Sequence, residues 1–135
     1  MSVTRIEVRE YLVEMATAGK IIYYAELYNH FKIRTGPAND INPIPMFLGL
    51  IMREDANHHE PLLPSIVVNK NKDTPRSNLL PNDKYFETLS SIRGVEIPTR
   101  GRLKSKVQRE YFLPERDAVF ALYSETGQLV EPEDE

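Results

Sequence analysis

The chain has 135 residues, of which 41% are hydrophobic and 27% are charged, and its formal net charge is −3. This size and composition fit one globular domain with a single modest core. The absence of cysteine excludes disulfides, thiolate metal sites and cysteine nucleophiles. No apolar run approaches the length of about 18 residues that a membrane span needs, and the N-terminus lacks a signal-peptide pattern. We therefore expect a soluble, cytoplasmic protein with no membrane partner.

The N-terminal segment predicts two helices separated by a short strand. Thr4 can cap a helix over residues 5–18, in which apolar residues recur near helical spacing, and Gly19 can end it. Residues 20–24, KIIYY, are β-branched and aromatic and favour a short strand. Residues 25–31, AELYNHF, continue the chain as a second helix.

A loop and a third helix are expected next. Residues 32–43 contain a Gly-Pro pair and several polar residues, which is typical of a loop. The third helix includes residues 46–55, MFLGLIMRED. Asn42 or Asp40 can cap it, with Pro43 or Pro45 in its first turn.

The middle of the chain predicts a buried strand and a polar turn. Residues 64–69, PSIVVN, contain the uninterrupted apolar run 66–68, which favours a strand buried on both faces. The following NKNKDTPR, residues 69–76, predicts a solvent-exposed hairpin or wing. A fourth helix is expected between Asp83, as its cap, and Gly94, as its end.

The C-terminal region predicts two further helices. Leu103, Val107 and Tyr111 lie four residues apart, and this spacing indicates an apolar, core-facing stripe of one helix. A second helix can begin at Pro114, because proline is favoured in a first turn. Residues 125–135 form an acidic segment that we predict to be disordered.

The order of these elements is typical of a winged helix-turn-helix domain. We therefore predict an α+β, mainly helical fold: a winged helix-turn-helix-like domain over residues 1–124, with a short β-hairpin wing and extra C-terminal helices. Sequence order is the only basis for this prediction, since the chain contains none of the common nucleic-acid-binding motifs.

Three segments add a resemblance to a known family. Residues 19–27, GKIIYYAEL, resemble the opening of the DNA-binding domain of alkylguanine-DNA alkyltransferases and alkyltransferase-like proteins. Residues 47–55, FLGLIMRED, resemble a second motif of that family, and residues 62–69, LLPSIVVN, stand in the place of its active-site strand. The resemblance covers about fifty residues, and it implies a DNA-binding domain.

Residue by residue, the resemblance argues against alkyl transfer. Ser65 stands where the family has its acceptor cysteine, and a serine hydroxyl needs an activating base to act as a nucleophile. Ile66 and Val67 replace the histidine and arginine of the family. Tyr24 matches the family's tyrosine. Met46 stands where the family inserts an arginine into the base stack, and we interpret it as a core residue.

The candidate phosphate contacts are cations of the predicted wing and of a basic segment. Residues 93–116 hold seven Arg and Lys against three Glu, a balance of +4, so the rest of the chain sums to −7. Clustered cations attract polyanions whatever the net charge of the protein. The alternative is that these groups only keep the surface soluble. The predicted nucleic-acid-binding residues are Lys70, Lys72, Arg76, Arg100, Arg102, Lys104, Lys106, Arg109, Arg53 and Tyr24.

We predict no catalytic residue, metal, cofactor or small-molecule substrate. The three histidines, His30, His58 and His59, do not have the spacing of a known metal motif. Nucleotide-binding, dinucleotide-binding and serine-hydrolase motifs are also absent.

Two hypotheses of different classes follow. In the first, the chain is a non-enzymatic DNA-binding module that contacts duplex DNA mainly through phosphates. The alternative is a protein-interaction subunit, of a kind that a phage or mobile element could encode, on a winged-helix scaffold that has lost DNA affinity. Net acidity, the replacement of the inserted arginine and the apolar loop residues Ile41, Pro43, Ile44 and Pro45 favour this alternative.

Overall fold

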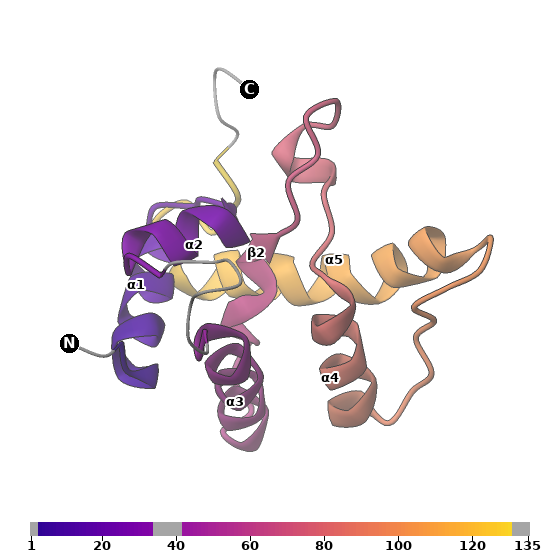
Figure 1. The fold of residues 1–135 in the computed structure, drawn as a ribbon, viewed down its shortest axis with the longest axis horizontal. Coiled ribbons are helices and arrows are strands. Elements are labelled where there is room, and N and C mark those ends of the chain that lie inside the picture. Colours follow the sequence, from indigo (N-terminus) through magenta and orange to yellow (C-terminus); the bar gives the residue numbers. More distant parts are fainter. Residues whose placement is uncertain (1–2, 34–41, 131–135) are drawn as a thin grey trace.

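A computed structural model describes residues 3–33 and 42–130 of the chain. These residues form a mainly helical fold with one small parallel sheet (Figure 1). In chain order the elements are α1 (Arg5–Thr17), β1 (Ile22–Tyr23), α2 (Tyr24–His30), α3 (Ile44–Asn57), the 3₁₀ turn η1 (Leu63–Ile66), β2 (Val67–Val68), the 3₁₀ turn η2 (Arg76–Asn78), α4 (Asp83–Arg93) and α5 (Lys104–Tyr123). No helix in the described ranges combines the length and apolarity of a membrane span.

Helix α1 begins and ends as predicted. The Thr4 hydroxyl accepts a hydrogen bond from the Glu7 N–H at 3.2 Å, and the Glu7 carboxylate accepts one from the Thr4 N–H at 2.9 Å. This reciprocal pair satisfies two N–H groups that lack helical partners. Gly19 follows the helix with a φ of +71°, and its carbonyl accepts a hydrogen bond from the Val130 N–H at 2.8 Å. The C-terminal segment is therefore attached beside the end of α1.

The observed sheet is parallel, whereas the sequence predicts a β-hairpin or wing at residues 69–76. Strand β2 pairs in parallel with β1, with Ile22 opposite Val67 and Tyr23 opposite Val68. Because parallel strands need a crossover connection, β1 and β2 are joined through α2 and α3 and not by a tight turn. Residues 69–82 form no strand, so the β-hairpin wing is absent from this described segment. The strands themselves are buried, as predicted.

The predicted strand over residues 64–69 is largely a 3₁₀ turn. Only Val67 and Val68 are in the strand, while Pro64, Ser65 and Ile66 belong to η1. Proline supplies no N–H to a ladder, and its fixed φ suits the first turn of a helix, which explains the difference. Ser65 is consequently held inside a buried turn.

The N-cap position of helix α3 is Pro43, and Asn42, one of the two predicted caps, lies one residue before it. The Asn42 carbonyl oxygen Oδ1 accepts a hydrogen bond from the Ile44 N–H at 3.0 Å, and Pro45 lies in the first turn. Asp40, the other predicted cap, lies outside the described residues. The helix runs as far as Asn57 and buries an apolar face that packs against α1 and α4.

Helix α4 is capped one residue earlier than predicted. The side-chain oxygen of Asn82, not of Asp83, accepts a hydrogen bond from the Tyr85 N–H at 3.0 Å. Gly94 ends the helix in the left-handed region, as its lack of a Cβ allows.

The C-terminal region forms one helix, not two. Helix α5 is continuous from Lys104 to Tyr123 and contains Pro114 in its interior. It packs along η1 and α1 (Figure 1). The core includes Phe86 of α4 and Phe112 and Phe120 of α5, which are almost completely buried.

The apolar stripe predicted for α5 faces solvent. Leu103 is 58% exposed and Tyr111 is 38% exposed, while Gln108 and Phe112 are buried instead. Gln108 can be buried because its amide donates a hydrogen bond to the Pro98 carbonyl at 2.8 Å. The core-facing side of this helix was therefore predicted wrongly.

Candidate nucleic-acid interface

An open groove of about 340 Å³ separates the polar excursion after β2 from the first turns of α5. The excursion comprises residues 69–82 and projects from the body of the molecule (Figure 1). The groove is lined on one side by the excursion and Asp83 and on the other by Lys104, Ser105, Gln108 and Arg109. Segments more than twenty residues apart thus share one surface.

The excursion is held by hydrogen bonds at its base and in its turn. The Asn69 N–H donates to the Leu80 carbonyl at 2.9 Å, which closes the base. In the turn, Asn71 accepts a hydrogen bond from the Asp73 N–H at 3.1 Å through its side chain, as expected of an Asn in a turn. Leu79 is buried below and anchors the return of the chain.

Two arginines of α5 fix the excursion from the other side. Arg109 Nη2 donates to the Asn78 carbonyl at 2.9 Å, and Arg116 Nη1 donates to the Ser77 carbonyl at 2.9 Å. We predict Arg109 from the sequence as a phosphate contact, and the sequence predicts no role for Arg116. Neither contact has a local signal in the sequence, because each joins residues more than thirty positions apart.

Three of the predicted cations line the groove. Lys70 comes from the excursion, whereas Lys104 and Arg109 come from α5. Lys70 is exposed, and Lys104 Nζ lies 3.9 Å from the Asp83 carboxylate, a distance at which an exposed ion pair contributes little. Both ammonium groups therefore remain available to an anion in the groove.

A second depression of about 510 Å³ shares one wall with the groove. It is lined by residues 70–76 together with Tyr23. Lys72 is exposed there, and Lys70 Nζ lies 5.6 Å from the centre of the Tyr23 ring. Lys70 thus belongs to both hollows of the excursion.

Arg76 is a structural residue. Its guanidinium donates two hydrogen bonds to the Glu26 carboxylate at 2.9 and 3.1 Å and one to the Ile21 carbonyl at 2.9 Å. It also lies 4.0 Å from the centre of the Tyr23 ring, which adds a cation–π contact. These partners tie the excursion to β1 and α2.

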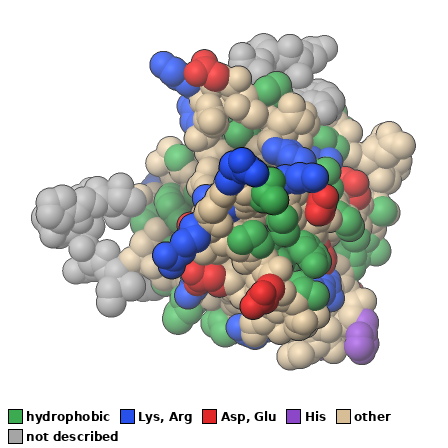
Figure 2. Space-filling view, turned by 90° about the vertical axis from the view of Figure 1, so that its right-hand side faces the viewer, with side chains coloured by type: hydrophobic (Ala, Val, Ile, Leu, Met, Phe, Trp, Pro, Cys, Tyr) green, Lys and Arg blue, Asp and Glu red, His purple; other side chains and the backbone are tan. Residues whose placement is uncertain are grey.

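The remaining predicted cations line neither the groove nor the second depression. Arg100, Arg102 and Lys106 are exposed at or just before the start of α5. The face of the molecule drawn in Figure 2 carries several Lys and Arg side chains, a hydrophobic patch and scattered carboxylates. Arg53 is exposed on α3 and lines neither the groove nor the second depression.

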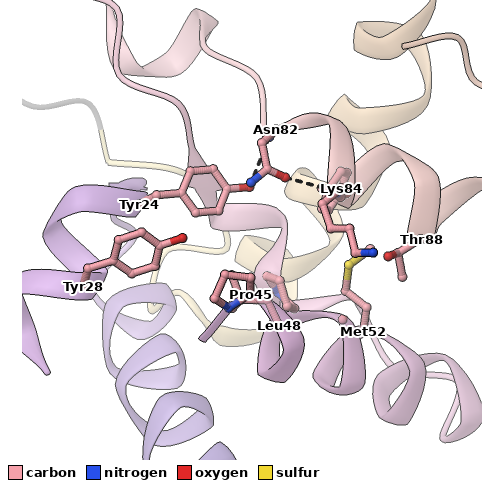
Figure 3. Close-up of a pocket in the computed structure, with 11 residues that line it drawn as sticks. Tyr24, Tyr28, Pro45, Leu48, Met52, Asn82, Lys84 and Thr88 are labelled. Atoms are coloured by element: carbon pink, nitrogen blue, oxygen red, sulfur yellow. Dashed lines mark hydrogen bonds between the residues drawn. The ribbon is translucent and has the colours of Figure 1, made fainter. Parts of the chain in front are cut away.

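Tyr24 lines a separate, narrow pocket between α2, α3 and α4 (Figure 3). Its hydroxyl accepts a hydrogen bond from the Asn82 N–H at 3.1 Å, and burial raises the pKa of its phenol. In Figure 3, Lys84 and Thr88 lie on the α4 side of this pocket and Met52 on the α3 side. The volume is about 20 Å³, enough for about one water molecule and far too little for a nucleobase.

Ser65 follows Pro64 and contacts Tyr85, and both of these neighbours line this pocket. Its hydroxyl is 2.7 Å from the Tyr85 hydroxyl, and both residues are buried. Burial raises the pKa of the Tyr85 phenol, so the group nearest Ser65 stays protonated near neutral pH and does not serve as a base. The pair fills a core position with two mutually satisfied hydroxyls.

Met46 is not the core residue that we expected. It is 60% exposed on α3, one turn before Leu50, which is 39% exposed. Ile44, expected to be part of an apolar surface loop, is instead fully buried, and Ile41 lies outside the described residues. No group of three or more potential metal ligands occurs among the described residues.

In comparisons with family models, with curated proteins and with solved structures, nothing matches this chain. The resemblance to the alkyltransferase DNA-binding domain therefore remains an expectation based on three short segments.

Proposed function

We propose that this chain is a non-enzymatic module that binds duplex DNA mainly through phosphates, which it holds in the groove between the excursion and α5. The supporting observation is that Lys70 lines the same groove as Lys104 and Arg109. These cations are distant in sequence, and gathering them on one surface is what phosphate recognition requires.

The groove also offers neutral hydrogen-bonding groups beside its cations. Asn69, Asn71, Thr74 and Ser105 line it, and amide and hydroxyl side chains commonly contact the sugar-phosphate backbone. The excursion is anchored by Arg76, Arg109 and Arg116. It should therefore lose little conformational entropy when it binds DNA.

The helix order supports the finer description of a helix-turn-helix-like unit. Helices α1, α2 and α3 precede the buried strand β2, and side chains of α2 and α3 meet around the narrow pocket. In this proposal the excursion contacts DNA as the wing of such a domain would, although it is a loop held by arginines.

Fluorescence anisotropy with a labelled duplex tests the proposal. We expect binding at about 50 mM salt, and an affinity that falls as salt rises with a logarithmic slope near −2.7 for about three phosphate contacts. Absence of binding at low salt, or binding that is insensitive to salt, contradicts the proposal.

A protein-interaction role is the second candidate. Its support is the exposed pair Met46 and Leu50 on α3, since neighbouring exposed apolar side chains are typical of docking surfaces. Pull-down with the wild-type chain and with Met46→Lys separates the two functions, because the substitution lies outside the groove. Loss of a protein partner without loss of duplex binding favours this candidate.

A further inference from the structure

An apolar stripe runs along the full solvent-facing side of α5. Leu103, Tyr111 and Leu122 are 58%, 38% and 54% exposed. Between them, Pro114 is exposed and Val107 and Ala118 are half-buried. Successive members are three or four residues apart, so they share one helix face. This face does not contribute to the core, which α5 contacts through Phe112, Val119 and Phe120 on another side. The stripe is Leu103, Val107, Tyr111, Pro114, Ala118 and Leu122.

The stripe is symmetric about its own midpoint. Tyr111 and Pro114 are equally far from a point between Phe112 and Leu113, and the same holds for the pair Val107 and Ala118 and for the pair Leu103 and Leu122. Two such helices placed antiparallel would bring each residue of the stripe opposite its counterpart. A surface that complements itself after a twofold rotation is the basis of an isologous dimer.

The distribution of charge along α5 favours an antiparallel pair of these helices over a parallel pair. Before its midpoint α5 carries Lys104, Lys106 and Arg109 against Glu110, and after the midpoint it carries Glu115 and Asp117 against Arg116. Antiparallel pairing places the basic half of one helix against the acidic half of the other. Parallel pairing would instead place like charges together.

We propose that a second copy of this chain covers the stripe, forming a twofold symmetric dimer through antiparallel α5 helices. Lys106 and Asp117 lie on the same edge of the stripe, and both are exposed. At 1.5 Å per residue, Lys106 of one copy lies within about 3 Å, along the helix axis, of Asp117 of the second copy. The seam therefore carries two intermolecular ion pairs, both along one edge and one on each side of the twofold axis.

The proposal is independent of the proposed function. Of the groove residues on α5, Ser105, Gln108 and Arg109 project from other sides of the helix than the stripe, whereas Lys104 lies at the edge of the stripe away from Lys106 and Asp117, so the groove lies beside the seam. A helix of 20 residues is about 30 Å long. A seam of two such helices is at the small end of specific interfaces, which bury about 1,200–2,000 Å², and we expect micromolar association.

Sedimentation equilibrium between about 1 and 200 µM, which brackets a micromolar constant, tests the dimer with two charge variants. Lys106→Glu places two acids together in each of the two intermolecular pairs, and Asp117→Lys places two lysines together in each. We expect each variant alone to associate at least tenfold more weakly than the wild type. Mixed in equal amounts, the two variants restore opposite charges in both pairs, and we expect a heterodimer of nearly wild-type affinity.

Control measurements and two contradicting outcomes complete the test of the dimer. Both substituted positions are exposed, so circular dichroism should be that of the wild type. Asp117→Lys also removes the ion pair of Asp117 with Arg116 at 3.2 Å, which as a surface pair contributes little, and Leu122→Glu should abolish association as a control for the stripe itself. A wild-type chain that stays monomeric throughout the range contradicts the proposal. So does a mixture that associates no better than its two components.

Discussion

Arg9 of α1 donates a hydrogen bond to Asp55 of α3, with Nη1 and Oδ1 2.8 Å apart, and this pair joins the two helices at the edge of the core. Asp55 is 1% exposed, and its other oxygen accepts a hydrogen bond from the Leu63 N–H at 2.9 Å. Arg9 also reaches Glu54 at 3.0 Å. A single guanidinium thus compensates the one buried carboxylate among the described residues and connects α1, α3 and η1 around it.

Arg9→Ala should therefore destabilise the fold. Removing the guanidinium leaves a buried carboxylate without its cation, which costs about 3 kcal/mol. Chemical denaturation with urea measures the change. In the double variant Arg9→Ala/Asp55→Asn the charge is gone, and we expect about half of the loss to be recovered. A double variant no more stable than Arg9→Ala would mean that packing, not the unpaired charge, causes the loss.

The stability should also depend on pH through Asp55. Burial raises the pKa of this carboxyl, against the opposing effects of the Leu63 N–H and Arg9. Since the folded chain binds this proton more tightly than the unfolded chain, the contribution falls as the pH rises from the unfolded pKa, near 3.9, through the folded one. Arg9→Ala should enlarge this fall, and Asp55→Asn should remove it. The midpoints of urea unfolding between about pH 4 and 7 measure the effect. If the midpoints of Arg9→Ala and Asp55→Asn change equally with pH, this account of Asp55 is contradicted.

Ser65 and Tyr85 should behave as a structural pair. Tyr85→Phe leaves the buried Ser65 hydroxyl without its partner and should cost about 1–2 kcal/mol, while Tyr85→Phe/Ser65→Ala should recover much of that loss. A thermal melt of the two variants checks this.

A cysteine at position 65 should be inert. Because the position is fully buried, the thiol would keep a raised pKa and little thiolate. We expect Ser65→Cys to react with a thiol reagent only after unfolding. Rapid labelling of the folded variant would instead indicate an accessible reactive pocket.

Arg76→Ala should weaken the fold and DNA binding together. Its hydrogen bonds to Glu26 and Ile21 and its stacking on Tyr23 hold the excursion to β1, so we expect a loss of about 2–3 kcal/mol. Arg76→Lys should not restore stability, since an ammonium group cannot reproduce a bidentate contact. If Arg76→Ala lowers duplex affinity and leaves the melting temperature unchanged, Arg76 is a phosphate contact and not the anchor described above.

Local signals predicted much of the helical framework. The Thr4 cap, the glycines after α1 and α4 and the burial of the apolar run 66–68 each depend on residues close in sequence, and the structure confirms them, although only Val67 and Val68 of that run form a strand. The parallel pairing of β1 with β2 is a long-range choice. The turn after β2 suggested a hairpin because nothing local distinguishes the two arrangements.

The errors on α5 have a similar cause. Two apolar spacings coexist on this helix, one through Leu103 and Tyr111 and one through Phe112 and Phe120, and sequence alone does not show which one meets the core. The role of Arg76 was also hidden, because Glu26 is fifty residues away. The grouping of Lys70 with Lys104 was a hypothesis that only the packing of the excursion could test.

The most direct test of the groove is the salt dependence of duplex binding by Lys70→Gln/Lys104→Gln. The control is Lys20→Gln/Lys84→Gln, which removes the same charge from exposed lysines that line neither the groove nor the second depression. If the groove holds phosphates, the first variant should bind more weakly, and its logarithmic salt slope should be shallower by about 1.8, or two contacts. The control should keep a slope near that of the wild type. Equal slopes in the two double variants would contradict the account.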